Sequence, residues 1–372
     1  MSRNSTEVYA GKPVDIRQIG IDLQVRYVLE GSVQRQGEQI RVTAQLIDAR
    51  TAAHVWSERW DRPNTDVFAL QTEIVKQAAG RLGGSGVIME AEHRAVQRKR
   101  PGNLSAYEKY LVAREGLMAP TREGTDEAIV LFKQVLDEDP TLARAWADLA
   151  WAYDHTTWFG ADYATAHPLA LEAARRAVEI DPMDGQAHAV LGNQIAYDGD
   201  FERGKVELET ALRLNPGSAN ILTLYASWAS TFGDPKLGGE LADQAIRLDP
   251  NYPPVMAGSF YIAYFMADRY EDALHIIDRQ PVENRTRHSW AIRAASYAAI
   301  DEPEKAAAAT KEALEHQPDL TAEGFANEPG FNPTERQKLA QSMLAAGFPA
   351  CASPEKLAGI ATPFRLPECV KA

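Results

Sequence analysis

Five prolines at a regular interval constrain the fold more than any other feature of the sequence. They are Pro140, Pro182, Pro216, Pro250 and Pro318, and each follows an alanine-rich stretch. The steps between them are 42, 34, 34 and 68 residues, which are multiples of 34 apart from eight extra residues in the first step. Because proline lacks an N–H and restricts the residue before it, each one is expected to end a helix. The sequence therefore predicts a stack of repeated helical units.

The helices before these prolines share a further pattern. A tryptophan and a tyrosine seven positions apart recur as Trp146 with Tyr153 and as Trp290 with Tyr297, among many alanines. Small residues are required where two helices approach closely, and large rings fill the wider gaps between neighbouring pairs. A 34-residue unit of this kind is typical of the tetratricopeptide (TPR) repeat. We therefore expect Trp146 and Trp290 to be buried between helices.

The sequence thus predicts a mainly α fold. A TPR α-solenoid of about six helix pairs is expected over 104–320, with a degenerate fifth pair at roughly 253–286 and a C-terminal helix and tail over 321–372. The eight additional residues of the second unit fall between its helices. Trp158 and Phe159, which lie in this insertion, either form an exposed recognition loop or fold back over the helix ends.

Residues 1–62 follow a different pattern. Apolar residues have helical spacing over 14–23, whereas 25–60 alternate β-branched and polar residues around a turn at Gln36-Gly37. A further amphipathic helix is expected at about 66–82, within a helix and linker region over 63–103. When 6–10 is counted as a first strand, the region is a small α/β domain of β-α-β-β-β-α order.

Four segments of this region carry a family resemblance, namely RNSTEVYAGKPVDIRQIG, VRYVLEGSV, IRVTAQLIDA and HVWSERWDR. They resemble the amino-terminal domain of TolB, in the form that joins TPR arrays in bacterial proteins. The tail of the chain also resembles the C-terminal region of class III adenylate or guanylate cyclases that carry such arrays. Gln24 and Ala52 stand where this family usually has glycine, which costs little at negative φ and more at positive φ.

The same resemblance implies that the α/β domain is truncated. Related domains have a strand, an acidic loop and a helix before the segment that here begins at Arg3. We therefore expect an uncovered sheet and self-association through residues 1–62. The resemblance supplies no catalytic residue, because the part of the family that it covers contains none.

A TPR solenoid presents set positions of each first helix along a concave groove. Asparagines there can bind a peptide backbone, and aromatic side chains can anchor a partner, although Trp151 is equally expected to serve packing. No lysine is found at the positions that would clamp a C-terminal carboxylate. The predicted groove residues are Trp151, Asp154, Asn193, Tyr197, Asn220, Thr223 and Ser227.

Composition limits the partners and the compartment. A net charge of -13 disfavours nucleic acid, and no run of 18 apolar residues is present to suggest a membrane span. Cys351 and Cys369 are the two cysteines of the chain, which predicts a reducing, cytoplasmic environment. They could pair, but the prolines at 354 and 363 between them indicate a loose tail, so free thiols are expected.

The sequence contains no P-loop, GxGxxG, HExxH or CxxC motif, and its eight histidines are scattered. It therefore predicts neither a cofactor nor a metal site. We expect a noncatalytic protein-interaction scaffold with a protein or peptide partner. The alternative is the regulatory half of a class III nucleotide cyclase whose catalytic domain is absent from this chain.

Overall fold

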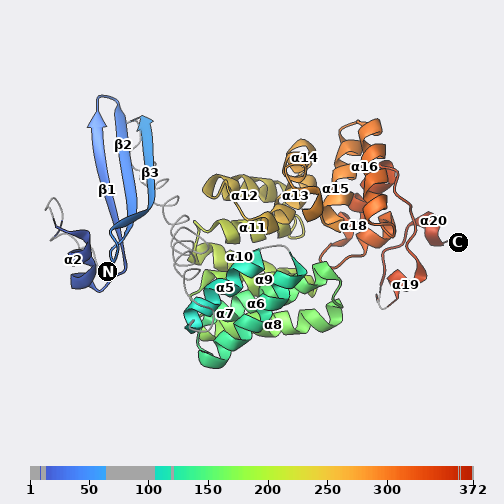
Figure 1. Cartoon of the computed structure of the whole chain (residues 1–372). Coiled ribbons are helices and arrows are strands. Elements are labelled where there is room, and N and C mark those ends of the chain that lie inside the picture. The colour runs from blue at the N-terminus through green and yellow to red at the C-terminus, as the bar shows by residue number, and fades with distance from the viewer. Residues whose placement is uncertain are drawn as a thin grey trace. The chain divides into compact units, whose positions relative to one another are not determined.

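A computed structural model describes Tyr9 and residues 14–63, 105–118, 121–358, 360 and 362–370. The chain divides into two compact units, Met1–Arg98 and Lys99–Ala372. Figure 1 shows the first as a helix with a sheet and the second as an array of helices. The predicted strand at 6–10, apart from Tyr9, and the predicted helix at 66–82 with its linker lie outside the described residues.

The first unit contains the predicted helix followed by three strands. Helix α2 (Ile16–Leu23) precedes an antiparallel sheet of order β1-β2-β3. The strands are β1 (Tyr27–Gln36), β2 (Gln39–Asp48) and β3 (Ala53–Pro63). The turn between β1 and β2 places Gly37 at φ 59°, a conformation that glycine adopts without strain. This arrangement confirms the hairpin and the third strand.

Helix α2 packs closely against the end of β2. A Cβ on Gly20 would lie 2.4 Å from the Cβ of Ala49, so only glycine fits at this contact. Ile19, on the same helix, is also buried. Gln24 and Ala52 have positive φ, at 52° and 58°. Because glycine adopts positive φ without strain, these replacements of glycine reduce stability more than they would at negative φ.

The second unit consists of helices that pack as consecutive antiparallel pairs. Their bounds are α5 (Ala106–Met118) with α6 (Arg122–Glu138), α7 (Ala143–Thr156) with α8 (Tyr163–Ile180), α9 (Gly185–Tyr197) with α10 (Phe201–Leu214), α11 (Ala219–Trp228) with α12 (Pro235–Leu248), α13 (Ala257–Met266) with α14 (Tyr270–Asp278), and α15 (Arg287–Ala299) with α16 (Pro303–His316). The C-terminal elements are α17 (Ala322–Ala326), α18 (Pro333–Ala345), α19 (Pro354–Leu357) and α20 (Pro367–Val370).

The regularly spaced prolines end the second helix of a pair, as predicted. Helices α6, α8, α10, α12 and α16 each stop two residues before one of them. The residue between has a non-helical backbone, with φ from -133° to -140° and ψ from 74° to 89°. Polar side chains cap the starts of many helices, for example Asp184 on the N–H of Gln186 and Ser218 on that of Ile221. Local sequence therefore sets most helix ends in this unit.

The two helices of a pair approach closely where glycines face each other. A Cβ on Gly192 of α9 would lie 2.8 Å from the carbonyl oxygen of Gly204 in α10, and one on Gly204 would lie 3.0 Å from that of Gly192. Gly116 and Gly124 meet in the same way between α5 and α6. These contacts fix the spacing of the α5–α6 and α9–α10 pairs, as the small residues of the repeat predicted.

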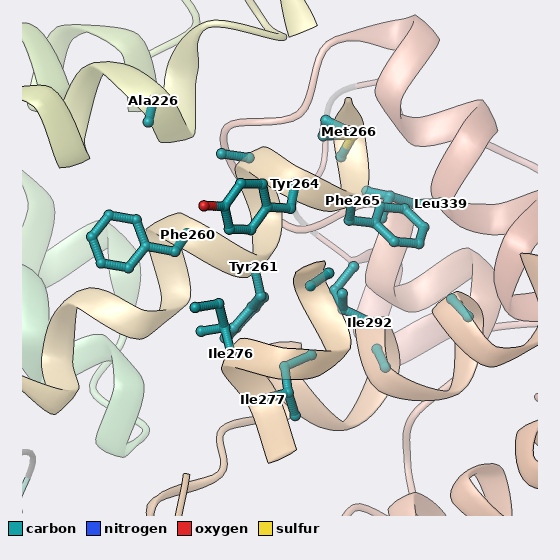
Figure 2. Close-up of a cluster of buried hydrophobic side chains, with 14 of the residues drawn as sticks. Ala226, Phe260, Tyr261, Tyr264, Phe265, Met266, Ile276, Ile277, Ile292 and Leu339 are labelled. Carbon is teal, nitrogen blue, oxygen red and sulfur yellow. The ribbon is translucent and has the colours of Figure 1, made fainter. Parts of the chain in front are cut away.

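The apolar core of the second unit is continuous from α9 to α20. Figure 2 shows its centre, where α13, α14, α15 and α18 converge. The labelled members include Phe260, Tyr261, Phe265, Ile277, Ile292 and Leu339. Because each pair contributes one face to this core, no pair could bury its apolar residues alone.

The two predicted tryptophans differ in burial. Trp290 is fully buried beneath Arg285 and His316, as expected. Trp146 is only half-buried, because its indole N–H donates a hydrogen bond to the carbonyl of Pro140 at the edge of the helix pair. Trp146 is therefore less buried than predicted.

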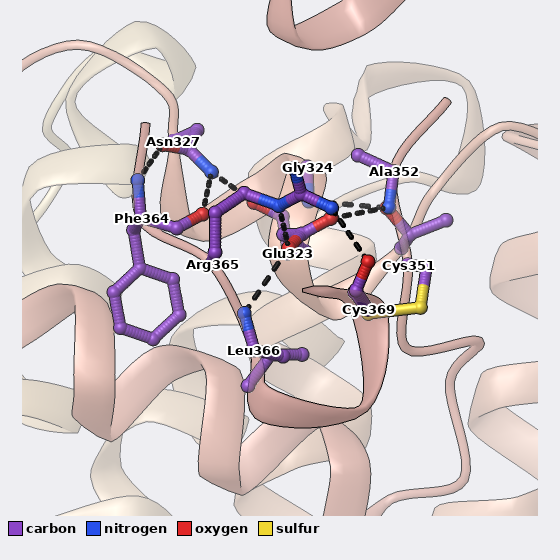
Figure 3. Close-up of polar contacts among 10 residues, drawn as sticks. Glu323, Gly324, Asn327, Cys351, Ala352, Phe364, Arg365, Leu366 and Cys369 are labelled. Atoms are coloured by element: carbon purple, nitrogen blue, oxygen red, sulfur yellow. Dashed lines mark hydrogen bonds and ion pairs between the residues drawn. A yellow bond between two sulfur atoms is a disulfide. The ribbon is translucent and has the colours of Figure 1, made fainter. Parts of the chain in front are cut away.

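The expectation of free thiols was also wrong. Cys351 and Cys369 form a disulfide across 18 residues of the tail. The tail is not loose, because it is bound to a buried carboxylate of α17. Sequence spacing could not reveal this contact. Figure 3 shows this contact, in which Glu323 accepts hydrogen bonds from Arg365 Nε (2.7 Å), the N–H of Leu366 (3.1 Å) and the N–H of Ala352 (3.0 Å).

Asn327 completes this attachment. Its side chain accepts a hydrogen bond from the N–H of Phe364 at 2.7 Å and donates one to the carbonyl of the same residue at 2.8 Å. The disulfide and these polar contacts therefore hold the two ends of the tail segment to α17.

Reduction of the disulfide should lower the free energy of unfolding by about 3 kcal/mol, because opening a loop of this length increases the entropy of the unfolded chain. Urea unfolding with and without a phosphine reductant measures this difference. A variant with both cysteines replaced by serine, Cys351→Ser and Cys369→Ser, should not respond to the reductant. Equal midpoints for the oxidised and reduced wild-type chain would contradict the prediction.

Candidate functional site

The predicted groove residues occupy three consecutive first helices. Trp151 and Asp154 lie on α7, Asn193 and Tyr197 on α9, and the remaining three on α11. Asp154, Asn193 and Thr223 are buried, whereas Trp151, Tyr197, Asn220 and Ser227 are half-buried. We call this set the first-helix face.

Two hydroxyls of this face are engaged within their own helix. Thr223 donates a hydrogen bond to the carbonyl of Ala219 at 2.7 Å, and Ser227 donates one to that of Leu224 at 2.8 Å. Their role in the structure is therefore local. Asp154 and Asn193 lie on α7 and α9, respectively.

Asn193 is held in one orientation by a neighbouring helix. The indole N–H of Trp228 donates a hydrogen bond to Asn193 Oδ1 at 2.8 Å, and the ring of Trp228 meets Tyr197 edge-on at 4.9 Å. The amide nitrogen of Asn193 is buried and has no hydrogen-bond partner. A buried donor of this kind is unusual in a native structure and calls for an explanation.

A polar chain that the sequence did not reveal runs next to Asp154. Gln194 Oε1 lies 3.1 Å from His167 Nδ1, and His167 Nε2 lies 2.6 Å from a carboxylate oxygen of Asp198. Gln194 is adjacent to a predicted groove residue, but nothing in the spacing links α9 to His167 of α8. The link arises from the packing of these helices.

Burial raises the pKa of Asp154 to about 7, and the nearby side-chain amide of Gln194 opposes this effect only in part. Burial together with the charge of nearby carboxylates, Asp154 among them, also raises the pKa of the Tyr163 and Tyr197 phenols. These shifts place both phenols in the electrostatic field of Asp154.

The insertion contributes a stack of rings to this region. His155 lies 4.0 Å from the ring of Trp158 and 5.1 Å from that of Trp151. Burial lowers the pKa of His155 to about 3, so the imidazole is neutral. Trp158 remains 44% exposed and Phe159 is half-buried beside Arg122. The rings therefore fold back onto His155 and Arg122, while Trp158 stays partly exposed, and a recognition role for the insertion remains a prediction.

The connection between α17 and α18 contacts the first helices of several pairs. A Cβ on Gly330 would lie 3.0 Å from the ring of Trp228 and 3.2 Å from that of Tyr197. Thr231 donates to the carboxylate of Glu335 at 2.9 Å, and Asn332 Nδ2 donates to the carbonyl of Thr231 at 3.2 Å. No local pattern predicts this contact, because it joins residues about a hundred positions apart.

An ion pair extends the contact to α15. Glu328 lies 2.8 Å from Arg287 Nε and 2.9 Å from His288 Nε2. Burial would raise the pKa of Glu328, but His288 and Arg287 hold it below its usual value. The ring of Phe331 also lies beside His288, at 6.4 Å. The first helices α9, α11 and α15 therefore bind a segment of the same chain through rings, main-chain groups and charges.

Among the residues that the structure describes, no group of three or more histidine, cysteine, aspartate or glutamate side chains could hold a metal ion. The helices within these ranges also include none that is long and apolar enough to cross a membrane.

Comparison with known proteins adds to this description. No family model matches the chain. A protein of Rhizobium meliloti (strain 1021) named "Putative adenylate cyclase 3" is 35% identical over 202 residues, which are 53% of this chain and 34% of that protein. The chain therefore matches about a third of the length of this relative.

Solved structures resemble this chain at low sequence identity. Human IFIT1, solved as a dimer with m7Gppp-AAAA, has a TM-score of 0.50 and 15% identity, covering 72% of this chain and 66% of that one. YrrB, described as a TPR protein with an unusual peptide-binding site, has a TM-score of 0.34 and 19% identity, covering 50% of this chain and 93% of that one. The helix pairs at 34-residue steps decide the type of fold.

The second unit is a TPR solenoid. The resemblance of residues 1–62 to the TolB amino-terminal domain is not confirmed by any of these comparisons. Within the TPR solenoid, the first-helix face of α7 and α9 combines a buried carboxylate, a free amide N–H and half-buried rings.

Asp154→Asn should stabilise the TPR solenoid increasingly as the pH rises. The folded-state pKa of Asp154 is raised to about 7, so the wild-type chain loses stability between the unfolded pKa near 4 and about pH 7, and the variant does not. The difference in free energy of unfolding should approach at most about 4 kcal/mol above pH 7. Urea unfolding at pH 4.5 and pH 8 measures it.

Asp137→Asn, on the exposed surface of α6, is the matched control and should leave the pH profile of the wild-type chain unchanged. A stability difference between Asp154→Asn and wild type that is constant with pH would show that Asp154 is not desolvated in the folded chain.

Proposed function

We propose that this chain is a noncatalytic scaffold that binds a protein segment along the first-helix face of α7 and α9. The observation that carries the proposal is that the α17–α18 connection packs against first helices of the solenoid. First helices of the same solenoid already bind a chain segment through Tyr197, Trp228 and the Glu328 ion pair. A face that binds one segment in this way has the chemistry to bind another.

Side chains on α7 and α9 supply the elements that such binding needs. Trp151 is a half-buried ring that can act as an anchor, whereas the ring of Tyr197 already contacts the α17–α18 connection. The unpartnered amide N–H of Asn193 can donate to a main-chain carbonyl. The hydrogen bond from Trp228 fixes that amide in advance, which lowers the entropic cost of binding.

The proposal assigns no catalytic activity, cofactor or metal to this chain. The cyclase alternative is not favoured, because the similarity covers 34% of the relative that bears that name. The IFIT1 structure contains a capped oligonucleotide, but a net charge of -13 opposes binding of a phosphate backbone here. We therefore propose a protein partner rather than a nucleic acid.

Two further expectations remain proposals. A cytoplasmic location was predicted from the low cysteine count, and the Cys351–Cys369 disulfide weighs against it because disulfides persist in oxidising compartments. Self-association through residues 1–62 is supported by the exposed Leu29 and Val33 of β1. A monomer mass at all loading concentrations in sedimentation would contradict self-association.

Selection of peptides from a random phage-displayed library on the purified chain tests the main proposal. The selected peptides should bind Asn193→Ala about tenfold more weakly, the loss expected for one hydrogen bond. Asn284→Ala replaces a half-buried asparagine outside the first-helix face and should leave the affinity unchanged. Both variants should retain the helical circular dichroism of the wild type.

Selected peptides that bind Asn193→Ala as tightly as the wild-type chain would place the binding surface elsewhere. Failure to select any peptide would contradict the proposal itself.

A further inference from the structure

Among the buried carboxylates of the described solenoid, Asp154 and Glu335 have no ion pair, and Glu335 accepts hydrogen bonds from the Thr231 hydroxyl and the N–H of Asn332 instead. Asp148 lies 3.3 Å from Arg114, and Glu323 lies 2.7 Å from Arg365. Asp154 is only 7% exposed, yet no lysine, arginine or histidine in the described ranges forms an ion pair with it. Its neighbour His155 is neutral and cannot serve as the counter-charge. A desolvated carboxylate without a counter-charge reduces stability, so its presence points to a use in binding.

The groups around Asp154 are fixed by hydrogen bonds on their far sides. Gln194 Oε1 is held by His167, which is held in turn by Asp198, and the buried amide nitrogen of Gln194 has no hydrogen-bond partner. Asn193, the next residue, has the same arrangement, with its oxygen held by Trp228 and its buried nitrogen unpartnered. Two adjacent amides are thus oriented before any partner arrives.

Aromatic side chains surround the same position. Trp151 lies three residues before Asp154 and so on the same side of α7. The phenols of Tyr163 and Tyr197 lie within the electrostatic reach of Asp154, because its charge contributes to raising the pKa of both. Rings of this kind attract a cation over their faces. A carboxylate among aromatic side chains is therefore suited to an ammonium or guanidinium group.

We propose that Asp154 receives a basic side chain, lysine or arginine, of the protein segment bound on the first-helix face of α7 and α9. This inference rests on the proposed function and specifies the chemistry of its partner. A long basic side chain can reach a carboxylate that lies below the surface while the main chain of the segment stays outside. The amide of Asn193 is left to bind a main-chain carbonyl of the same segment.

The charges of this region favour a basic partner over an acidic one. Asp198 and Glu328 add to the negative field at the two phenols, and each already has its own basic partner, His167 and Arg287 respectively. An acidic segment or a free C-terminal carboxylate would meet Asp154 in a poorly hydrated setting, where repulsion between like charges is strong. If Asp154 binds the partner, the chain should prefer basic peptides. If Asp154 has only a structural role, the chain should show no such preference.

Pairs of end-capped octapeptides that differ only by lysine or arginine against glutamine provide the test. The peptides are those selected on the wild-type chain, with both ends blocked. The wild-type chain should bind the basic member of a pair at least tenfold more tightly. Asp154→Asn should reduce this ratio to about twofold or less, while Asp137→Asn should keep it. Circular dichroism verifies that both variants are folded.

Three outcomes would overturn the inference: equal affinity of the wild-type chain for both members of a pair, preference for acidic peptides, or an unchanged ratio in Asp154→Asn. The failure of the proposed function is distinguishable from these outcomes. If peptides bind through Asn193 without preference for a basic residue, only this inference fails, whereas if no peptide binds at all, both fail.

Discussion

The close approach of the two helices in each pair is the contact on which the rest of the solenoid depends. Between α9 and α10 the backbones at Gly192 and Gly204 come so near that neither position has room for a Cβ without movement. This spacing turns one side of each first helix away from its own partner. Repetition at 34-residue steps then aligns those sides and produces the first-helix face.

The C-terminal segment limits how much of that face remains for a partner. The connection between α17 and α18 contacts Tyr197 and Trp228, and its Glu328 pairs with Arg287. The buried Glu323 and the disulfide hold the rest of the tail to α17. The first helices toward the C-terminus are thus engaged by the chain itself. Binding of a separate segment is left to the part of α7 and α9 where Asp154 has no ion pair and the amide nitrogen of Asn193 has no hydrogen-bond partner.

Sequence alone predicted the elements whose signals are local. The prolines from Pro140 to Pro318 marked helix ends, and the Gln36-Gly37 turn marked the hairpin, because each acts on its own neighbours in the chain. Sequence failed where the decisive partner is remote. The disulfide forms because the tail folds back onto Glu323. Trp146 remains half-buried because its N–H bonds to the carbonyl of Pro140, after the end of a helix, rather than packing against another helix. The Gln194–His167–Asp198 chain was equally invisible, since it forms only when α8 packs on α9.

Hydrogen–deuterium exchange of the full chain, with and without the tightest selected peptide, tests the central claim most directly. Bound peptide should slow exchange in α7 (Ala143–Thr156) and α9 (Gly185–Tyr197), which carry the first-helix face. The outer helices α8 and α10 should change little. Protection confined to α8 and α10, or to the sheet of the first unit, would show that the partner binds another surface and would contradict the account.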